Sequence, residues 1–433
     1  MLPEINATHD AARHSWIESA NEPGTDFPIQ NLPFGVFRTG SHVRGGVALG
    51  SLIIDLAVLI DKRLLSGGAL IAARAASAAS LAPLLCVSAA DVGALRARLS
   101  ELFSASASND RAELAQALVP MADAALLLPM KPAAFTDFCT SMHHIRRMSG
   151  TPDVLPRLAC MSLPVAYNGR ASSVIASGAP IFRPNGQFEA PPGSGIVRFG
   201  PEPMLDFELE FGAWLRGGNA IGEPISVAQA EEQLFGCCLV NDWSARGIQF
   251  FEMILGPHLG KSFATTVSPW IVTMEALAPF RTTAPARGAG EPAILPYLLD
   301  PSDQAKGAVN VELTADLVTG GGAAMRVVRT HTSGLYWTLA QMVAHQACGG
   351  APLEAGDLIA SGTVSGPTEE ARGCLAEITA RGTRPIELPD GTKRVMLEDG
   401  DTLTLRGRAV AQGFVPIGFG ECAGTIAPAR GIA

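Results

Sequence analysis

Hydrophobic and polar residues alternate strictly between Leu205 and Phe211. Side chains of a strand point alternately to its two faces, so the apolar residues are expected on one face and the three carboxylates, Asp206, Glu208 and Glu210, on the other. Carboxylates two residues apart on one face lie about 6–7 Å apart and repel each other. No lysine or threonine relieves this repulsion. The pattern therefore has two explanations, a bound cation or a solvated acidic strand face.

The pattern along the first 130 residues predicts a small β-unit followed by helices. Short apolar stretches broken by glycines over residues 31–60 indicate strands with hairpin turns. Residues 61–126 are rich in alanine and leucine and indicate helices, one of which is expected to begin at Asp91 as its N-cap and to reach about Phe103. Residues 1–25 are polar and lack periodicity, so we expect this end to be mobile.

Beyond residue 130 the pattern changes to short runs rich in Val, Ile, Phe and Thr with Gly or Pro turns between them. Strands are expected at residues 173–177, 205–214, 271–274, 309–317 and 402–408. Helices are expected at Val227–Leu234 and Tyr336–Cys348. We therefore predict two domains, an N-terminal domain with a helical linker over residues 1–130 and a β-rich catalytic domain over residues 131–433.

Composition narrows the class of protein. A chain of 433 residues with 47% hydrophobic and 17% charged residues can fold around a large core. A net charge of −9 argues against nucleic acid or an anionic membrane as a partner. The eight cysteines show no Cys-x-x-Cys spacing, which favours reduced thiols in a cytoplasmic protein. The N-terminus does not look like a secretory signal, and the most apolar stretch, Ala69–Val87, is interrupted by Arg74 and indicates a helix rather than a membrane span.

Four further motifs are more polar than their apolar surroundings. They are Asp137–His144, Asn241–Arg246, Leu259–Thr266 and Ser361–Gly366. Each motif alone also has a structural explanation, such as a helix cap, a surface ion pair, a solvated lysine or a buried core histidine. The lysine in the third motif lacks the Gly-x-x-x-x-Gly-Lys spacing of a phosphate-binding loop.

Taken together, these motifs resemble the fumarylacetoacetase family, which hydrolyses 4-fumarylacetoacetate to fumarate and acetoacetate. The similarity extends from the Asp26–Phe37 block to Gly418–Gly424, essentially the whole chain. Its strongest motifs are residues 167–173, 205–210, 241–246, 255–262, 265–270 and 361–367. Shorter members of the wider superfamily usually lack the small N-terminal domain, so the Asp26–Phe37 block favours the fumarylacetoacetases.

The resemblance implies a fold and an activity. The fold would be mainly β, with a small N-terminal SH3-like β-barrel domain and a large C-terminal β-roll catalytic domain, assembled as a homodimer. The activity would be metal-dependent hydrolysis of a carbon–carbon bond in a small diketo acid, in tyrosine and phenylalanine catabolism. One alternative is a related superfamily hydrolase or decarboxylase acting on another acylpyruvate or oxoacid. Another is a non-catalytic protein that kept the scaffold.

The resemblance also implies a metal site. The ligands would be Asp137, Glu208, Glu210 and Asp242, whereas Asp206 is a carboxylate that the family does not use directly. Four carboxylates suit a hard divalent cation, Mg²⁺ or Ca²⁺. A second, structural cation site would lie by Lys261 and Thr265.

The catalytic residues follow from the same resemblance. The histidine maps to His144 by its spacing from Asp137, although His143 stands beside it, and Glu377 matches the glutamate that orients this histidine. The groups that would stabilise negative charge and bind substrate are Arg246, Gln249, Lys261, Tyr167 and Thr363. The histidine would take a proton from water near neutral pH.

The chain departs from the family in its pocket. Cys139 and Met253 stand where the family has tyrosines, and the loop after His144 is shorter. The family's substrate-binding arginine has no clear counterpart in this loop. We expect Arg146 or Arg147 to cover the distal carboxylate, with Arg157 a weaker candidate and solvated surface arginines the alternative. The exact substrate therefore stays open.

Overall fold

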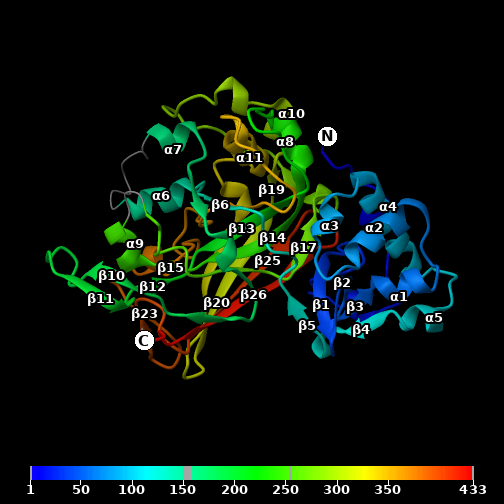
Figure 1. The fold of residues 1–433 in the computed structure, drawn as a ribbon, viewed down its shortest axis with the longest axis horizontal. Helices are drawn as coiled ribbons and strands as arrows, with labels where there is room; N and C mark the ends of the chain where they lie inside the picture. Colours follow the sequence, from blue (N-terminus) through cyan, green and yellow to red (C-terminus); the bar gives the residue numbers. More distant parts are fainter. Residues whose placement is uncertain (1, 150–157, 253–255, 432–433) are drawn as a thin grey trace.

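The computed structural model describes residues 2–149, 158–252 and 256–431 and has more residues in strands than in helices. In Figure 1 the N-terminal elements gather at one side of the molecule, and a hairpin formed by β10 (Asn185–Glu189) and β11 (Val197–Pro201) projects at the opposite side. None of the described helices is long and apolar enough to cross a membrane.

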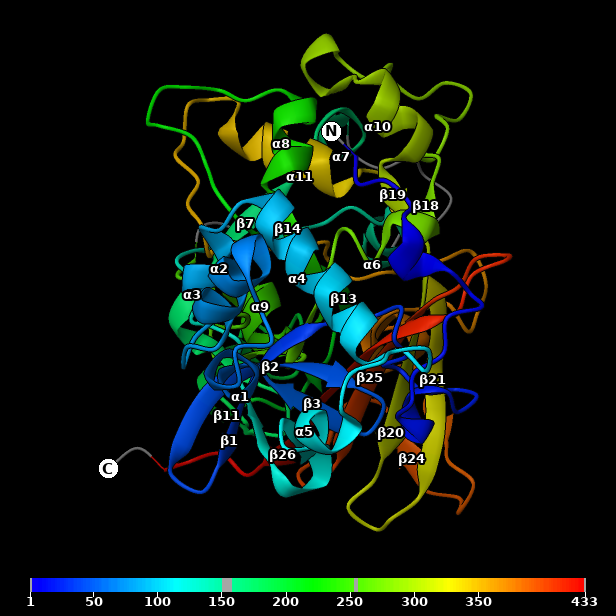
Figure 2. The same cartoon turned by 90° about the vertical axis from the view of Figure 1, so that its right-hand side faces the viewer.

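The N-terminal region is a sheet covered by helices, as the pattern over residues 31–126 predicts. Its strands are β1 (Phe34–Thr39), β2 (His42–Leu49), β3 (Leu52–Asp55), β4 (Leu118–Pro120) and β5 (Ala125–Leu127). Its helices are α1 (Leu56–Asp61), α2 (Gly67–Ala76), α3 (Ala82–Leu85), α4 (Ala89–Leu102) and α5 (Arg111–Ala115), of which Figure 2 brings α2 and α4 toward the viewer. The strands pair in the order β4-β3-β2-β1, with β5 also on β1. β4 and β5 show that the segment predicted as helical ends in strands.

This sheet is continuous with the sheet of the larger region, because β1 pairs with β17 (Trp270–Thr273). Gly35 lies opposite Trp270, and a Cβ at this position would stand 2.5 Å from Trp270 Cε3. Only glycine therefore allows the two strands to approach here. Strand pairing among the described residues leaves the sheet open rather than closing it into a barrel. The SH3-like barrel and the β-roll therefore remain predictions.

Two sheets enclose the main hydrophobic core of the larger region. The first continues from β17 through β14 (Leu234–Asp242), β13 (Leu209–Leu215), β22 (Leu358–Ala360), β6 (Phe135–Phe138) and β7 (Ala166–Gly169), with β16 (Thr265–Val267) on β14 and β8 (Val174–Ala176) on β16. The second has the order β21 (Ala324–His331), β20 (Val311–Val318), β25 (Thr402–Ala409), β26 (Ile417–Ala427), β9 (Pro180–Phe182). Phe211 of the first sheet packs edge-on against Phe419 of the second, with ring centroids 5.6 Å apart.

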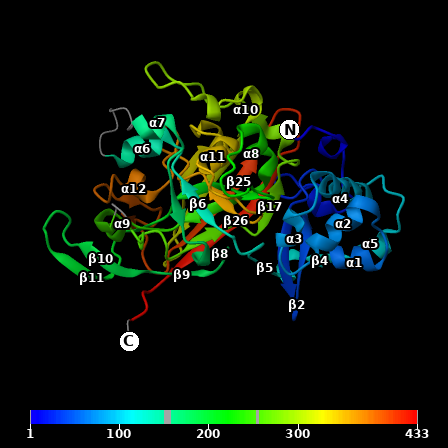
Figure 3. The same ribbon diagram turned by 45° about the horizontal axis from the view of Figure 1, so that its top comes forward.

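Short elements at the margins complete the fold. The two-stranded pairs besides β10–β11 are β12 (Leu205–Asp206) with β15 (Ser244–Ala245), β18 (Arg281–Thr282) with β19 (Ala308–Val309), and β23 (Ile386–Glu387) with β24 (Lys393–Arg394). The helices are α6 (Met142–Met148), α7 (Leu158–Ser162), α8 (Val227–Gln233), α9 (Arg246–Glu252), α10 (Pro301–Lys306), α11 (Leu339–Ala347) and α12 (Leu375–Ile378). Figure 3 shows α8 and α11 side by side above the sheets.

The strands predicted at 173–177, 271–274 and 402–408 are confirmed to within one residue, whereas those predicted at 205–214 and 309–317 are each divided into two strands. Helix α8 confirms the predicted helix Val227–Leu234. Two helix starts differ from the prediction. Ser88 rather than Asp91 caps α4, because the Ser88 hydroxyl accepts from the Asp91 amide at 3.1 Å. Helix α11 begins only at Leu339, after its cap Thr338.

The prediction of a mobile N-terminal end is wrong for the described residues 2–25. Thr8 and His9 are buried. Arg96 donates from Nε to Thr8 Oγ1 at 3.0 Å, and His9 Nε2 lies 2.8 Å from the carbonyl oxygen of Glu275. Polar residues without periodicity are therefore fixed here by hydrogen bonds to two distant parts of the chain.

Candidate metal centre and catalytic dyad

The run with alternating carboxylates forms two short strands rather than one. β12 pairs with β15 and β13 pairs with β14, so the chain changes partner after Asp206. Asp206, Glu208 and Glu210 are at most 5% exposed, and this burial excludes the solvated acidic strand face. Asp206 turns away from the other two, and its carboxylate accepts from the backbone amides of Leu375 and Ala376 at 2.8 and 3.0 Å.

Neighbouring strands bring four carboxylates together. Glu210 lies on β13, Asp242 ends the adjacent strand β14, and Asp137 lies on β6, which β22 separates from β13. Each of these residues and Glu208 offers one oxygen atom, and the four oxygens lie within 4.8 Å of one another. We call this set, Asp137, Glu208, Glu210 and Asp242, the carboxylate cluster. Ala360 of β22 lies beside Asp137 and adds no large side chain between the strands.

Part of the carboxylate cluster has no hydrogen-bonding partner. Both carboxylate oxygens of Glu210 and Oδ1 of Asp137 are buried and receive no hydrogen bond from the described residues. Burial, reinforced by the neighbouring carboxylates, raises the pKa of Asp137 and of Glu210 well above the usual range. Buried carboxylate oxygens without donors are costly unless a cation binds them. The donor set, all oxygen, fits Mg²⁺ or Ca²⁺.

The other half of the cluster is held by two cationic side chains. Lys261 Nζ lies 2.7 Å from Glu208 Oε2 and 2.8 Å from Asp242 Oδ2. Arg246 donates to Glu208 Oε1 at 2.6 Å and to Asp206 Oδ2 at 2.9 Å. Burial alone would lower the pKa of Lys261, but Asp242 and Glu208 raise it, so the ammonium stays charged. These ion pairs hold two of the ligands in place, and a cation would bind their oxygens through the lone pairs that the ion pairs do not use.

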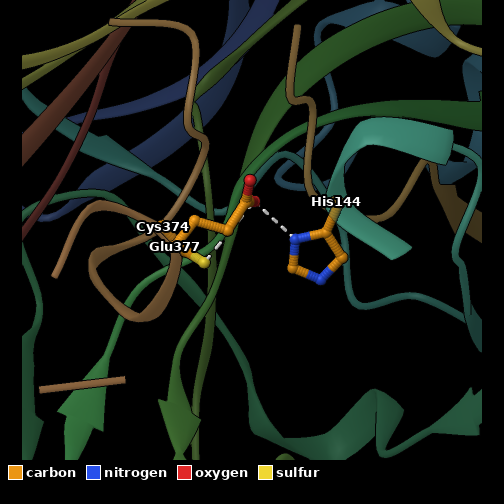
Figure 4. A group of neighbouring side chains, drawn as sticks. All are labelled: His144, Cys374 and Glu377. Atoms are coloured by element: carbon orange, nitrogen blue, oxygen red, sulfur yellow. Dashed lines mark hydrogen bonds and ion pairs between the residues drawn. The ribbon is translucent and has the colours of Figure 1, made fainter. Parts of the chain in front are cut away.

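His144 and Glu377 form a buried dyad beside the cluster. His144 Nδ1 lies 2.6 Å from Glu377 Oε1 (Figure 4). Ser365 donates to the same oxygen at 2.6 Å, and Arg147 donates to Oε2 at 2.9 Å. Burial alone would raise the pKa of Glu377, but His144 and these donors lower it to about 2. Because the carboxylate can only accept, Nδ1 carries the proton and Nε2 is the nitrogen available as a base.

The loop arginines differ from their expected position. Arg147 binds Glu377 and the carbonyl oxygen of Gly366, so it supports the dyad and does not extend toward a substrate. Arg146 faces Glu291, with 3.9 Å between the charged atoms. Arg157 lies outside the described residues, as does Met253. Among the side chains that contact Glu377, Arg147 was predicted in a different role, as a substrate ligand. Ser365 was missed, although it falls in the glycine-rich turn that the sequence singled out.

The remaining candidates surround the cluster. The Tyr167 hydroxyl donates to Asp242 Oδ2 at 2.6 Å, and the Thr265 hydroxyl donates to Oδ1 at 3.1 Å. Lys261 and Thr265 both contact Asp242, a member of the carboxylate cluster. The other group of three possible metal ligands found among the described residues, His144, Cys374 and Glu377, includes neither of them. A separate cation site there remains a prediction.

Two further residues border the candidate site. Thr363 Oγ1 is buried without a hydrogen-bonding partner among the described residues. Cys139 follows the cluster on the same segment as Asp137, and burial raises the pKa of its thiol, so it is a neutral thiol and not a nucleophilic thiolate. His143 is half-buried, and burial together with the two neighbouring arginines lowers its pKa.

Comparison with known proteins places these residues in a family. Residues 30–129 match the model of the fumarylacetoacetase N-terminal domain, and residues 133–427 match that of the fumarylacetoacetate hydrolase C-terminal domain. The chain is 42% identical to a fumarylacetoacetase of Oryza sativa, covering 96% of this chain and 97% of that protein. It is 41% identical to that of Bos taurus (94% and 98% covered) and 39% identical to that of Homo sapiens (94% and 97%).

A solved structure shares the fold. A fumarylacetoacetate hydrolase from Exiguobacterium antarcticum aligns with a TM-score of 0.50 at 16% identity, covering 92% of this chain and 100% of that chain. At this identity the likeness concerns the fold alone.

Proposed function

The chain belongs to the fumarylacetoacetase family, and we propose that it hydrolyses 4-fumarylacetoacetate to fumarate and acetoacetate. The observation that carries this proposal is the pairing of a buried four-carboxylate cluster with the His144–Glu377 dyad. The full-length relatives named fumarylacetoacetase support the substrate. The protein is then an enzyme of tyrosine and phenylalanine catabolism.

The carboxylate cluster would hold one Mg²⁺ or Ca²⁺ ion through Asp137, Glu208, Glu210 and Asp242. Such an ion supplies Lewis-acid stabilisation for the oxygens of a bound β-diketone. The buried oxygens of Glu210 and Asp137 that receive no hydrogen bond from the described residues support this assignment. Lys261 and Arg246 lower the pKa of Glu208 against the effect of burial, and Lys261 also orients Asp242 as a ligand.

His144 is the general base in this proposal. Glu377 fixes Nδ1–H of the ring, so Nε2 takes a proton from water as the water oxygen adds to the carbonyl carbon of the fumaroyl group. The bond from this carbon to the central methylene carbon then breaks. The electron pair of the broken bond stays on the methylene carbon of the acetoacetate fragment. This carbon then accepts the proton that His144 took from water. Water is thereby divided between the two products.

Negative charge on the oxygens during this step needs donors. Lys261 and Arg246 lie at the cluster, and Gln249 accepts from Arg246 at 3.0 Å through its oxygen, so its amide N–H groups stay available. A donor of this kind contributes about 2.7–4 kcal/mol in other enzymes. The unpartnered Thr363 hydroxyl and Tyr167, which lines the adjoining cavity, are the proposed substrate contacts.

The proposal includes finer points of organisation. We take residues 1–130 as the N-terminal domain, with an SH3-like barrel, and residues 131–433 as the catalytic β-roll, in a cytoplasmic homodimer that binds neither nucleic acid nor membrane. Sedimentation of the purified chain tests the dimer, and an experimental structure tests the two topologies.

One observation favours a second candidate, hydrolysis or decarboxylation of another acylpyruvate or oxoacid. Cys139, a neutral thiol two residues after Asp137 of the cluster, stands at a position where the resemblance implies a tyrosine. The purified protein should be incubated with fumarylacetoacetate and, separately, with acylpyruvates, while the loss of diketone absorbance is followed and the products are identified. Faster turnover of an acylpyruvate would replace the first proposal with the second.

A further inference from the structure

Two adjoining cavities lie beside the carboxylate cluster. A cavity of about 160 Å³ is lined by Tyr167, Gln249, Glu252, His258, Gly260 and Lys261. A larger cavity of about 390 Å³ is lined by residues 167–172, Pro257, His258 and Ser262, and we call it the anion pocket. Tyr167 and His258 line both, so the two spaces share a wall. The smaller cavity alone is below the roughly 300–1,000 Å³ of usual ligand sites, and the second space brings the site into that range.

The lining of the anion pocket has the chemistry of an anion site. None of its nine residues is acidic, and six carry side-chain donors: Tyr167, whose hydroxyl donates to Asp242, Asn168, Arg170, Ser172, His258 and Ser262. Within the part of the chain that the structure describes, neither the guanidinium of Arg170 nor the ring of His258 has a hydrogen-bond or ion-pair partner. A free guanidinium and an imidazole facing one space are well suited to a carboxylate.

The backbone places His258 at the junction of the two cavities. Its φ of +59° is in the left-handed region, which is unfavourable for a residue with a side chain. The carbonyl oxygen of His258 accepts from the amides of Lys261 and Ser262, each at 2.9 Å, and these bonds hold the turn. The ring then lies against Tyr167, with centroids 5.8 Å apart. The same turn therefore positions Lys261 at the cluster and His258 at the anion pocket.

The other cationic side chains discussed near the site already have carboxylate partners. Arg147 binds Glu377, Arg146 faces Glu291, and Lys261 is paired with two carboxylates of the cluster. Fumarylacetoacetate carries a carboxylate at each end, and a bound dianion needs donors beyond the cluster. Among the described residues around the two cavities, Arg170 is the arginine whose side chain has no partner.

We propose that the anion pocket binds the carboxylate of the fumaroyl end, with Arg170 and His258 as its ligands. This inference rests on the proposed function. It makes Arg170 and His258 specificity-determining residues and replaces the loop arginines in that role. The diketone then lies over the cluster, and the fumaroyl chain extends past Tyr167 and His258, which line both cavities, into the anion pocket.

The test compares two substrates. 3,5-Dioxohexanoate keeps the acetoacetate end and lacks the fumaroyl carboxylate. Arg170→Ala and His258→Ala should raise KM for fumarylacetoacetate by about 10- to 100-fold, the usual effect of losing a charge-assisted hydrogen bond, with kcat within about threefold. KM for 3,5-dioxohexanoate should not change. Arg170→Lys should recover part of the loss, and Arg74→Ala, at an exposed arginine on α2, is the matched control.

Equal effects of Arg170→Ala on both substrates, or none on either, would overturn the inference while leaving the hydrolase activity standing. If the wild-type protein does not hydrolyse fumarylacetoacetate, fumarate binding by calorimetry decides instead. Fumarate affinity at least tenfold weaker in Arg170→Ala supports the anion pocket. Equal affinity, or no fumarate binding by the wild type, overturns it.

Discussion

The dyad allows the sharpest prediction, through the substitution Glu377→Gln. Glutamine keeps the shape of the side chain but replaces one acceptor oxygen with an amide donor. In the native protein one carboxylate oxygen accepts from His144 and Ser365 and the other from Arg147. Whichever way the amide is turned, its N–H group therefore faces another donor, and Arg147 loses its ion pair.

The magnitude for stability follows from the lowered pKa of Glu377. A pKa of about 2 in the folded protein, against 4.5 for an ordinary glutamate, corresponds to about 3 kcal/mol of stabilisation. Because folding lowers this pKa, the unfolded chain binds more protons between pH 2 and 4.5. The stabilisation is therefore complete above about pH 4.5 and is lost as the pH falls toward 2. Glu377→Gln should remove both the stabilisation and its acid dependence.

The effect on turnover follows from the tautomer of His144. Without an ionised acceptor at Nδ1, the ring of His144 can carry its proton on Nε2. This nitrogen then can no longer act as a base. Removing the orienting carboxylate of a comparable Ser–His–Asp arrangement lowers kcat about 10⁴-fold. We expect a loss of about 10²–10⁴ here.

Two measurements check this prediction. Denaturant unfolding between pH 3 and 7 gives the free energy of unfolding, and loss of diketone absorbance gives kcat. Glu369→Gln is the matched control, because Glu369 is 85% exposed and its substitution should change neither quantity. A Glu377→Gln protein with kcat within threefold of the wild type, or with unchanged acid dependence of stability, would refute the role assigned to this carboxylate.

Three further predictions concern neighbouring residues. Glu208→Ala should lose the bound Mg²⁺ or Ca²⁺ in elemental analysis together with activity, and unchanged turnover of metal-stripped wild-type protein would contradict the metal assignment. His144→Ala should lower kcat by about 10²–10⁴, whereas His143→Ala should change it little. If His143→Ala had the larger effect, His143 and not His144 would be the general base. Arg147→Ala should lower kcat and leave KM unchanged for substrates with one carboxylate and for substrates with two, because Arg147 acts through Glu377. A rise in KM for the diacid alone would show that Arg147 binds the substrate.

The sequence predicts the elements of this fold better than it predicts their neighbours. Alternation and spacing predict the strands and identify Asp206, Glu208 and Glu210 as an unusual set of carboxylates, because both features depend on local periodicity. The break after Asp206 is not visible in the pattern, because it arises from pairing with β15, about forty residues further along the chain. Likewise, Arg147 resembles any exposed helical arginine until the fold brings Glu377, 230 residues away, within 2.9 Å.

The charge of the buried cluster leads to a final prediction about stability without metal. Five carboxylates, the cluster and Asp206, lie beside two cationic side chains, Lys261 and Arg246. Burial, reinforced by the neighbouring carboxylates, raises the pKa values of Asp137 and Glu210. Glu210→Gln replaces this carboxyl group, whose oxygens receive no hydrogen bond, with a neutral amide of the same shape.

In the presence of a chelator, this variant should therefore be at least as stable as the wild type, because the amide is already neutral, whereas burial of the Glu210 carboxyl at neutral pH carries the cost of protonating it. With saturating Mg²⁺ or Ca²⁺ the order should reverse, since only the wild type gains the binding energy, about 2.7 kcal/mol at a hundred times Kd. Thermal unfolding of both proteins with and without the ion measures this crossing. If Glu210→Gln were less stable than the wild type under both conditions, Glu210 would be a structural residue and the cation would lie elsewhere.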